Sequence, residues 1–294
     1  MPSAPWPLIE ISVAAVSDDN RSGLRSALLE LVAETPGLDF STDSTTGQFI
    51  FKAGTERCLG AALERLRAGP VAFETGQLQV AYRERLTRRR EIDFLHKRVI
   101  KGNEGQFARV KLRFEPSEPG VGNVFNATIA EATLPIEYVD GIERGVASVL
   151  TAGVVAGCPV IDITAELIDG AYHEIDSSPL AFEIAARAAF REALHGSSVL
   201  AEPIMAVEIA VPERSAARVI SDLQGRRGLI RDRSVRSDAT LITATVPLAE
   251  MLGFGSRLQS VAGDEACFSM AFSHYAPVPS LDLDPPPMVA ALRA

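Results

Sequence analysis

One short stretch of the sequence gathers side-chain types that enzymes use for nucleophilic and acid–base catalysis. Residues 172–178 read Tyr-His-Glu-Ile-Asp-Ser-Ser. His173, Asp176 and Ser177 have the types of a Ser/His/Asp site, but triad members normally come from separate elements, and the sequence has no Gly-x-Ser-x-Gly elbow. One histidine with neighbouring acids also lacks the usual spacing of metal ligands. His173 therefore has three interpretations: a loop residue held through Asp176, a contact with RNA, and a catalytic base.

A second stretch, residues 102–106, reads Gly-Asn-Glu-Gly-Gln and has a different character. Gly102 and Gly105 permit close approach of the backbone to another molecule, and Asn103 and Gln106 both donate and accept hydrogen bonds. A protein tip that enters an RNA groove needs such thin loops with little side-chain bulk. In residues 172–178, aromatic rings can stack on bases and hydroxyl groups can bond phosphates. Both stretches are candidates for RNA contact, and the alternative is a pair of solvated loops.

The composition is that of an ordinary globular protein. The chain has 294 residues, of which 47% are hydrophobic and 23% charged, so intrinsic disorder is not indicated. No run of about 20 apolar residues occurs, and the N-terminus lacks the pattern of a secretory signal. Three widely spaced cysteines argue against a disulfide framework or a Cys-x-x-Cys metal site and suit a reducing cytosol, and all three are expected in the core.

The net charge of −9 restricts nucleic-acid binding to local basic patches, because proteins that grip nucleic acid over their whole surface are usually basic. Only four of the 29 basic residues are lysine, and three of these lie between residues 97 and 111. The arginine-rich run 83–90 is either a phosphate-binding segment or a charged connector. A second cluster consists of Arg226, Arg227, Arg231 and Arg233, which follow a predicted helix, and its structural interpretation is a solvated face.

Hydrophobic periodicity divides the chain into three segments. Residues 1–80 and 201–276 show the same order of elements, strand-helix-strand-strand-helix-strand, without close sequence identity. Strands are expected at 8–16, 39–43, 48–53 and 71–74, and helices at 18–34 and between Thr55 and Gly69. In the second copy, strands are expected at 205–211, 229–235, 241–246 and 267–272, and helices at 214–223 and 249–261. Each copy predicts a small ferredoxin-like β-α-β-β-α-β sandwich.

The central segment, residues 81–200, follows another pattern. Strands are expected at 92–100, 107–114, 124–130 and 160–167, helices at 137–152 and 179–194, and a loop at 168–178. Ser178 is a natural N-cap for the last helix, and Pro179 suits its first position. The sequence therefore predicts an α+β protein in which two ferredoxin-like sandwiches flank a central α/β domain, followed by a Pro-rich tail at 277–294.

Motifs along most of the chain resemble those of bacterial elongation factor G, a translational GTPase. The strongest lies at 170–178, where Gly-Ala-Tyr-His-Glu-Ile-Asp-Ser-Ser is similar to the Gly-Ser-Tyr-His-Asp-Val-Asp-Ser-Ser loop of that family's fourth domain. Residues 102–107 resemble its Gly-Gly-Arg-Gly-Gln-Tyr turn. Further matches stand in order at 79–84, 152–162, 202–205, 222–228, 246–251 and 254–255. The resemblance covers roughly residues 5–276, the third, fourth and fifth domains of the family, and the first segment also resembles ribosomal-protection tetracycline-resistance proteins.

The resemblance implies a ribosome-binding arm that acts in translocation of the tRNA–mRNA complex, with the loops of the fourth domain at the decoding centre. It implies contacts with RNA or the ribosome by Gly102, Asn103, Gly105, Gln106, Tyr172, His173, Asp176, Ser177, Ser178, Arg226 and Arg227. The expected partners are the ribosome, with its RNA and proteins, and the tRNA–mRNA complex. The chain is expected to be a cytoplasmic monomer that contacts no membrane.

A GTPase also needs a glycine-rich phosphate loop followed by Lys and Ser or Thr, and the sequence contains no Gly-Lys pair. We therefore expect no enzymatic activity, catalytic residue, metal or cofactor in this chain; GTP and Mg²⁺ would belong to an N-terminal GTPase domain of a parent protein. The alternative is a stand-alone paralogue without that domain, serving as a ribosome-associated binding or protection module.

One residue departs from the family pattern in the first candidate loop. Glu104 stands where the family usually has Arg, and its negative charge disfavours contact with phosphate. This departure favours the stand-alone alternative. Nearby cations that can compensate are Lys97, Arg98, Lys101 and Arg109.

Overall fold

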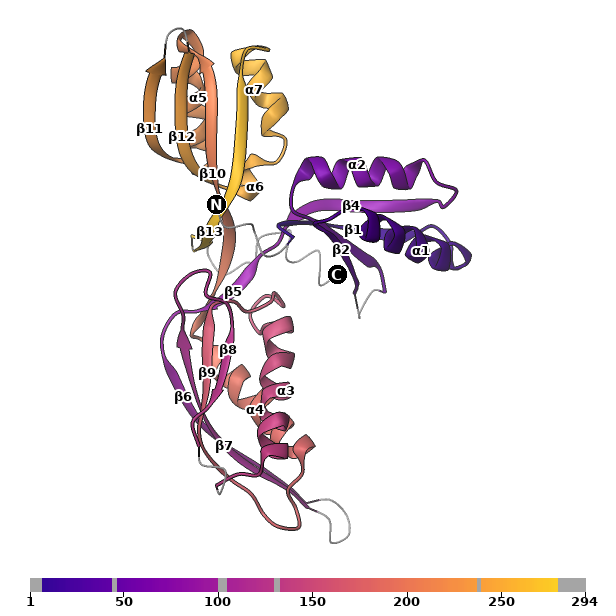
Figure 1. The fold of residues 1–294 in the computed structure, drawn as a ribbon, viewed down its shortest axis with the longest axis vertical. Coiled ribbons are helices and arrows are strands. Elements are labelled where there is room, and N and C mark those ends of the chain that lie inside the picture. Colours follow the sequence, from indigo (N-terminus) through magenta and orange to yellow (C-terminus); the bar gives the residue numbers. More distant parts are fainter. Residues whose placement is uncertain (1–6, 44–46, 100–104, 130–132, 237–238, 280–294) are drawn as a thin grey trace. The chain divides into compact units, whose positions relative to one another are not determined.

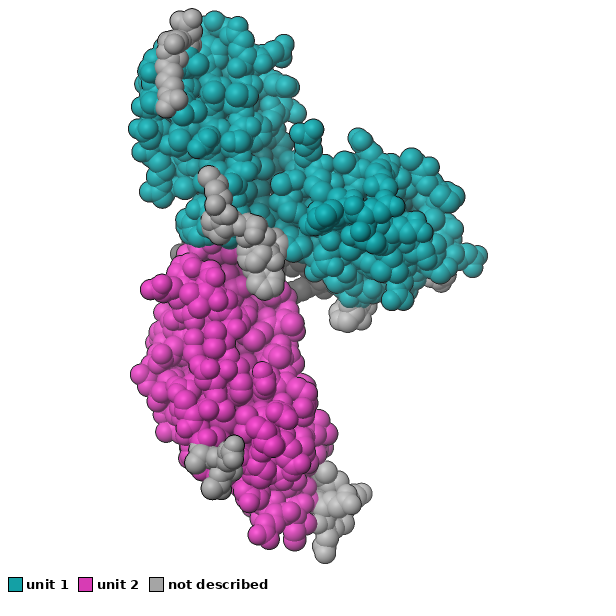
Figure 2. Space-filling view, viewed as in Figure 1, with its two compact units in different colours: residues 1–81, 202–274 teal, residues 82–201, 275–294 magenta. Residues whose placement is uncertain are grey.

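The structure is a computed structural model that describes residues 7–43, 47–99, 105–129, 133–236 and 239–279. The chain forms two compact units, coloured separately in Figure 2. One unit combines Met1–Ala81 with Glu202–His274, and the other combines Tyr82–Ala201 with Tyr275–Ala294. Within the described part of the chain, no helix has both the length and the apolar character needed to cross a membrane.

The N-terminal segment has the predicted order of six elements (Figure 1). They are β1 (Ile9–Ala15), α1 (Asp18–Glu34), β2 (Leu38–Thr42), β3 (Phe49–Ala53), α2 (Glu56–Arg67) and β4 (Phe73–Val80). The sheet order is β2-β3-β1-β4 with antiparallel pairing. Apolar residues of α1 such as Leu24 and Leu28 are fully buried, together with Val13 and Phe51 of the sheet. Thr55 caps α2 as expected, since its hydroxyl accepts a hydrogen bond from the Cys58 N–H.

The C-terminal segment repeats this arrangement. Its elements are β10 (Ser198–Pro212), α5 (Glu213–Gly225), β11 (Leu229–Arg236), β12 (Ala239–Pro247), α6 (Leu248–Met251), α7 (Phe254–Ala262) and β13 (Cys267–Pro277), and its sheet order is β11-β12-β10-β13. The single helix expected at 249–261 is wrong, because the chain breaks it into α6 and α7. Leu252 is extended and Gly253 has φ +69°, a left-handed conformation that glycine adopts without steric cost.

The central segment contains a four-stranded sheet covered on one face by two helices (Figure 1). Its elements are β5 (Arg83–Leu86), β6 (Arg90–Val99), β7 (Gly105–Pro116), β8 (Val124–Ala127), α3 (Ile136–Ala152), β9 (Ile163–Ala171) and α4 (Pro179–Leu194). The sheet order is β6-β7-β9-β8, in which β8 and β9 are parallel and the other pairs antiparallel. Strand β5 was not predicted; it pairs outside this sheet, with residues Ser198–Ala201 of β10. The predicted fold class is confirmed.

Helices α3 and α4 pack closely because α3 presents two glycines to α4. A Cβ atom at Gly141 would lie 2.5 Å from the Pro179 carbonyl oxygen, and one at Gly145 would lie 2.4 Å from the Glu183 carbonyl oxygen. On the α4 side, the Cβ atom of Ala186, which is fully buried, would lie 3.0 Å from a Cβ atom at Gly145. The lack of side chains at Gly141 and Gly145 therefore lets the two helices approach closely.

Two smaller expectations are corrected by the structure. Strand β9 continues to Ala171, so the expected loop at 168–178 begins four residues later, after the strand has paired with β7. Of the three cysteines, all free thiols, only Cys158 is buried, whereas Cys58 is partly exposed and Cys267 exposed. Cys267 begins β13, where exposure alternates along the strand: Cys267 and Ser269 are exposed, whereas Phe268 and Met270 are partly buried, so Cys267 lies on the outer face of the sheet.

Candidate nucleic-acid interface

The two candidate loops meet at one end of the central sheet. The Gly105 N–H donates to Asp176 Oδ1 at 3.1 Å, and the Phe107 N–H donates to the Asp176 carbonyl oxygen at 2.9 Å. The Ser177 hydroxyl donates to the Phe107 carbonyl oxygen at 2.7 Å. A Cβ atom at Gly105 would lie 2.7 Å from Asp176 Cγ, so a side chain at this position would displace the Asp176 carboxylate. The start of β7 and the loop after β9 therefore form one tip, and Gly102 and Asn103 lie outside the described residues.

His173 stabilises the conformation of its own loop, residues 172–178, through hydrogen bonds. Its Nδ1 atom accepts hydrogen bonds from the N–H groups of Ile175 and Asp176, both at 3.3 Å, and lies 3.6 Å from Asp176 Oδ2. The Ser177 hydroxyl accepts from the His173 N–H at 2.9 Å and donates to a backbone carbonyl, so it is engaged with main-chain atoms. This geometry favours the loop-holding role of His173 over the catalytic interpretation. Half of the His173 side chain remains exposed, at 54%, and is accessible to a partner.

The other predicted residues of the tip divide into partly buried supports and exposed groups. Ser178 caps α4, since its hydroxyl accepts from the Ala181 N–H at 3.2 Å. Gln106 Oε1 lies 3.0 Å from His96 Nε2. The Tyr172 ring lies 5.7 Å from the Tyr138 ring and is 43% exposed. Ser178 is therefore used within the chain, whereas Tyr172 offers an aromatic surface to solvent.

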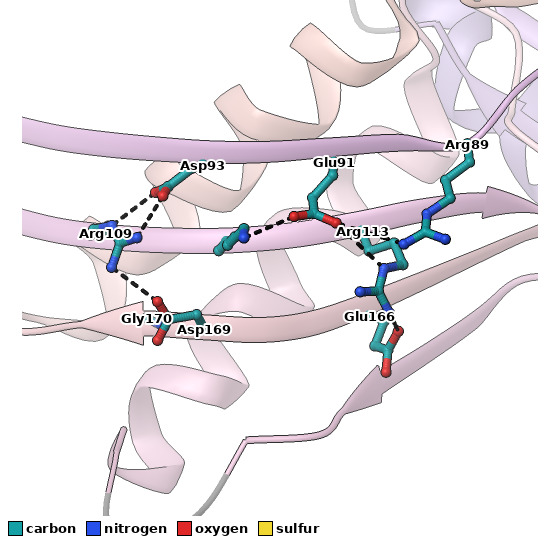
Figure 3. Close-up of polar contacts among 9 residues, drawn as sticks. Arg89, Glu91, Asp93, Arg109, Arg113, Glu166, Asp169 and Gly170 are labelled. Carbon is teal, nitrogen blue, oxygen red and sulfur yellow. Dashed lines mark hydrogen bonds and ion pairs between the residues drawn. The ribbon is translucent and has the colours of Figure 1, made fainter.

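Charged side chains cover the face of the central sheet opposite the helices, and most of them are paired (Figure 3). Arg109 of β7 bridges Asp93 of β6 at 2.5 Å and Asp169 of β9 at 3.1 Å. Further pairs are Lys111–Glu91, Arg113–Glu91, Arg113–Glu166, Arg89–Glu91 and Arg89–Glu115. Arg109 is thus engaged by two acids, which argues against the compensating role expected for it. Glu104 and Lys101 lie outside the described residues.

These ion pairs shift the titration of the acids involved. The pKa of Glu91 is lowered, chiefly by its hydrogen bond with Lys111 and also by the charges of Lys111, Arg113 and Arg89. The pKa of Asp93 is lowered chiefly by its hydrogen bond with Arg109. Both carboxylates are exposed, so the stabilisation from each pair is small.

The arginine run at 83–90 serves the chain internally. Arg83 is buried and donates to the Tyr82 carbonyl oxygen, and Arg85 donates to the Ser117 carbonyl oxygen at 3.0 Å. Arg88 donates to the Ser197 hydroxyl at 3.3 Å. These contacts favour the interpretation of the run as a charged connector rather than a phosphate-binding segment.

The arginines of the C-terminal sandwich are also engaged. Arg227 donates to both carboxylate oxygens of Glu202, at 2.6 and 2.9 Å, and to Glu250 at 3.2 Å. Hydrogen bonding to Glu202 raises the pKa of the Arg227 guanidinium above its usual value. Arg226 donates to Asp222 at 2.8 Å and lies over the Phe254 ring. These pairs give both arginines a structural role, and ribosome contact by either remains a prediction.

Two buried acids were missed by sequence reasoning. Glu84 is fully buried, and its carboxylate accepts three hydrogen bonds, each 2.8 Å long, from the N–H groups of residues 154–156. Asp162 has φ +54°, and its Oδ1 atom accepts from the N–H groups of Gly120 and Gly122. Both acids hold loops at the end of the central segment where β5 and β10 pair. Two signals were available: each acid lies inside an otherwise apolar or arginine-rich pattern, and each ends a stretch that resembles the family, at 79–84 and 152–162.

No group of three or more His, Cys, Asp or Glu side chains suited to a metal ion occurs within the described ranges. The cluster of His173, Glu174 and Asp176 thus does not form such a group. The tip instead offers hydrogen-bonding groups and aromatic surface, and Lys97 is an exposed cation beside it at the end of β6, whereas Arg98 is exposed on the other face of the sheet.

The three segments of the chain match models of one protein family. Family models for elongation factor G match in consecutive order: domain III at residues 4–77, domain IV at 78–198 and the C-terminus at 199–284. These matches define a chain built from domains of a translation elongation factor. The chain belongs to the elongation factor G family.

Individual relatives agree with this assignment. Elongation factor G of Rhodopseudomonas palustris strain BisB18 is 47% identical over 278 residues, which are 94% of this chain and 40% of the relative. A crystal structure of a protein from Thermus thermophilus superposes with a TM-score of 0.72 at 32% identity, covering 99% of this chain and 43% of the other. The chain thus spans about two fifths of the length of these relatives.

Proposed function

We propose that this chain is a ribosome-binding arm that acts in the cytoplasm during translocation of the tRNA–mRNA complex. The tip of the central domain reaches the decoding centre and occupies space into which the complex would otherwise slip back. The ribosome and the tRNA–mRNA complex are its partners. The work is mechanical, and this chain requires no nucleotide or metal of its own for it.

The observation that carries the proposal is the clamp between the two loops of the tip. Three hydrogen bonds of Asp176 and Ser177 join residues 105–107 to the loop after β9, so polar contacts hold the described part of the tip in one conformation. An ordered tip loses little conformational entropy when it enters an RNA crevice. The family membership supports the same role.

Cosedimentation with ribosomes in sucrose gradients tests the proposal. The chain should bind at low salt, where charge contacts are strongest. Asp176→Ala should weaken binding because it removes the hydrogen bond that ties the Gly105 N–H to the loop after β9. Asp39→Ala, which replaces an exposed acid of β2, is a charge-matched control and should bind like the wild type. Absence of binding at low salt would refute the proposal.

A translocation assay separates the proposal from its alternative. Chain added to ribosomes should reduce backward movement of the tRNA–mRNA complex, and this effect should be lost with Asp176→Ala. Binding that leaves this movement unchanged would instead favour a ribosome-associated binding or protection module.

A further inference from the structure

Three side chains form a row across the open face of the central sheet at its tip. Lys97 of β6 lies directly opposite Phe107 of β7 in the antiparallel register. Ile92 of β6 and Ala108 of β7 are buried against the helices, so the alternation of side chains along each strand places Lys97 and Phe107 on the opposite, open face. Side chains opposite each other in such a pair are about 5 Å apart at Cβ.

The row continues from Phe107 to the loop after β9. The Phe107 ring lies 6.3 Å from the His173 ring at an interplanar angle of 55°. Phe107 is half-buried, and its backbone is held by the bonds to Asp176 and Ser177. The row therefore runs from an ammonium group to two neighbouring rings on a fixed backbone.

Lys97 differs from the other cations on this face. Arg109, Lys111 and Arg113 are each paired with acids (Figure 3). Lys97 is exposed and forms no ion pair with any residue the structure describes. Its charge is therefore available to an external anion, and it lies beside the tip rather than at the far end of the sheet.

We propose that this row binds one nucleotide of an RNA strand, with a phosphate at Lys97 and the base against Phe107 and His173. The proposal rests on the proposed ribosome-binding function and assigns its contact residues. A lysine ammonium binds phosphate as a point charge, and aromatic rings stack on bases without sequence preference. The orientation follows from charge, because Glu174 and Asp176 on the loop repel a phosphate from the ring end of the row.

Salt dependence of ribosome binding tests the phosphate end. The dissociation constant of the full chain is measured from about 50 to about 200 mM salt. Lys97→Gln should weaken binding at low salt and reduce the slope of log affinity against log salt by about one, as expected for loss of one phosphate contact. Lys97→Arg should restore both.

Arg98→Gln is the matched control. Arg98 is the next residue on the same strand, is exposed, and lies on the other face of the sheet, so this change removes the same charge without touching the row. It should alter the slope much less than Lys97→Gln. Both positions are exposed at a strand end, so neither change threatens the fold.

Substitution of Phe107 tests the base end. Phe107→Leu removes the ring but keeps an apolar side chain, and it should weaken binding about tenfold while the salt slope stays unchanged. Phe107→Tyr keeps a ring and should bind like the wild type.

The results separate the two proposals. If the wild-type chain fails to bind ribosomes at low salt, the proposed function fails and the nucleotide site fails with it. If the wild type binds, but Lys97→Gln matches Arg98→Gln or Phe107→Leu matches the wild type, the nucleotide site is refuted and the proposed function stands.

Discussion

Replacement of Gly145 by alanine should destabilise the central unit, although alanine is the better helix former. In α3 the new Cβ would lie 2.4 Å from the Glu183 carbonyl oxygen and 3.0 Å from Ala186 Cβ, whereas ordinary contact begins at 3.4 Å. To relieve this steric clash, α3 and α4 must separate by about 1 Å, because the obstructing atom is a backbone oxygen that cannot rotate away.

The expected change in the free energy of unfolding for Gly145→Ala combines two opposing contributions. Overpacking of a tight core costs about 1–3 kcal/mol, and a rigid backbone obstacle places Gly145→Ala near the upper end. Alanine regains about 1 kcal/mol over glycine through its helix propensity. The expected net loss in the free energy of unfolding is therefore about 2 kcal/mol.

Gly60→Ala is the matched control, since Gly60 lies in α2 and no atom lies within 4 Å of its added Cβ. This substitution should stabilise α2 by up to about 1 kcal/mol. Urea unfolding followed by circular dichroism gives the overall change, and hydrogen exchange with mass spectrometry measures α2 and α3 separately. Equal stabilisation by both substitutions would refute the close packing of α3 on α4.

Three further outcomes are expected. Arg227→Ala should lower the free energy of unfolding of the C-terminal sandwich by about 3 kcal/mol in urea, because the Glu202 carboxylate, only 3% exposed, loses its partner. Adding Glu202→Gln should recover most of this loss, and no recovery would contradict the explanation. The lowered pKa values of Glu91 and Asp93 stabilise the folded chain at pH values above their ordinary pKa values of 4.5 and 3.8, and this stabilisation is lost as pH falls through the lowered values. Thermal unfolding across this pH range should show a small loss of stability that high salt reduces. A gain in stability on acidification would contradict this expectation. Ser177→Ala removes a hydroxyl that makes two hydrogen bonds with backbone groups at the tip. Hydrogen exchange at residues 105–107 should become about tenfold faster, consistent with a loss of about 1–2 kcal/mol in the free energy of local opening. Unchanged exchange would show that the contact between the two loops does not depend on this hydroxyl.

Local signals in the sequence identified most of the elements. Thr55 and Ser178 cap the helices expected to follow them, because capping depends only on residues within one turn. The helix at 249–261 was wrong for the converse reason: its apolar periodicity continues across Gly253, and the left-handed backbone there cannot be read from periodicity.

The candidate site likewise combines features that the sequence indicated with features that only the folded structure shows. The resemblance implied that residues 102–106 and 170–178 both contact RNA as loops of one domain, and the structure joins the described part of the first to the second. The sequence did not predict that Asp176 and Ser177 direct their polar groups toward the partner loop, since this depends on the register of β7 beside β9. The engagement of Arg109 with acids on two other strands has the same origin.

The sequence by itself determined the order of strands and helices, the α+β class and the family resemblance, because these depend on periodicity and on motifs of a few adjacent residues. Only the tertiary structure decided which polar groups are consumed internally and which face solvent. Lys97 and Arg109 are both cations of the same sheet, and pairing across strands leaves Lys97 exposed beside Phe107 while it neutralises Arg109. Charge pairing depends on distances between residues far apart in the chain, and those distances exist only after folding.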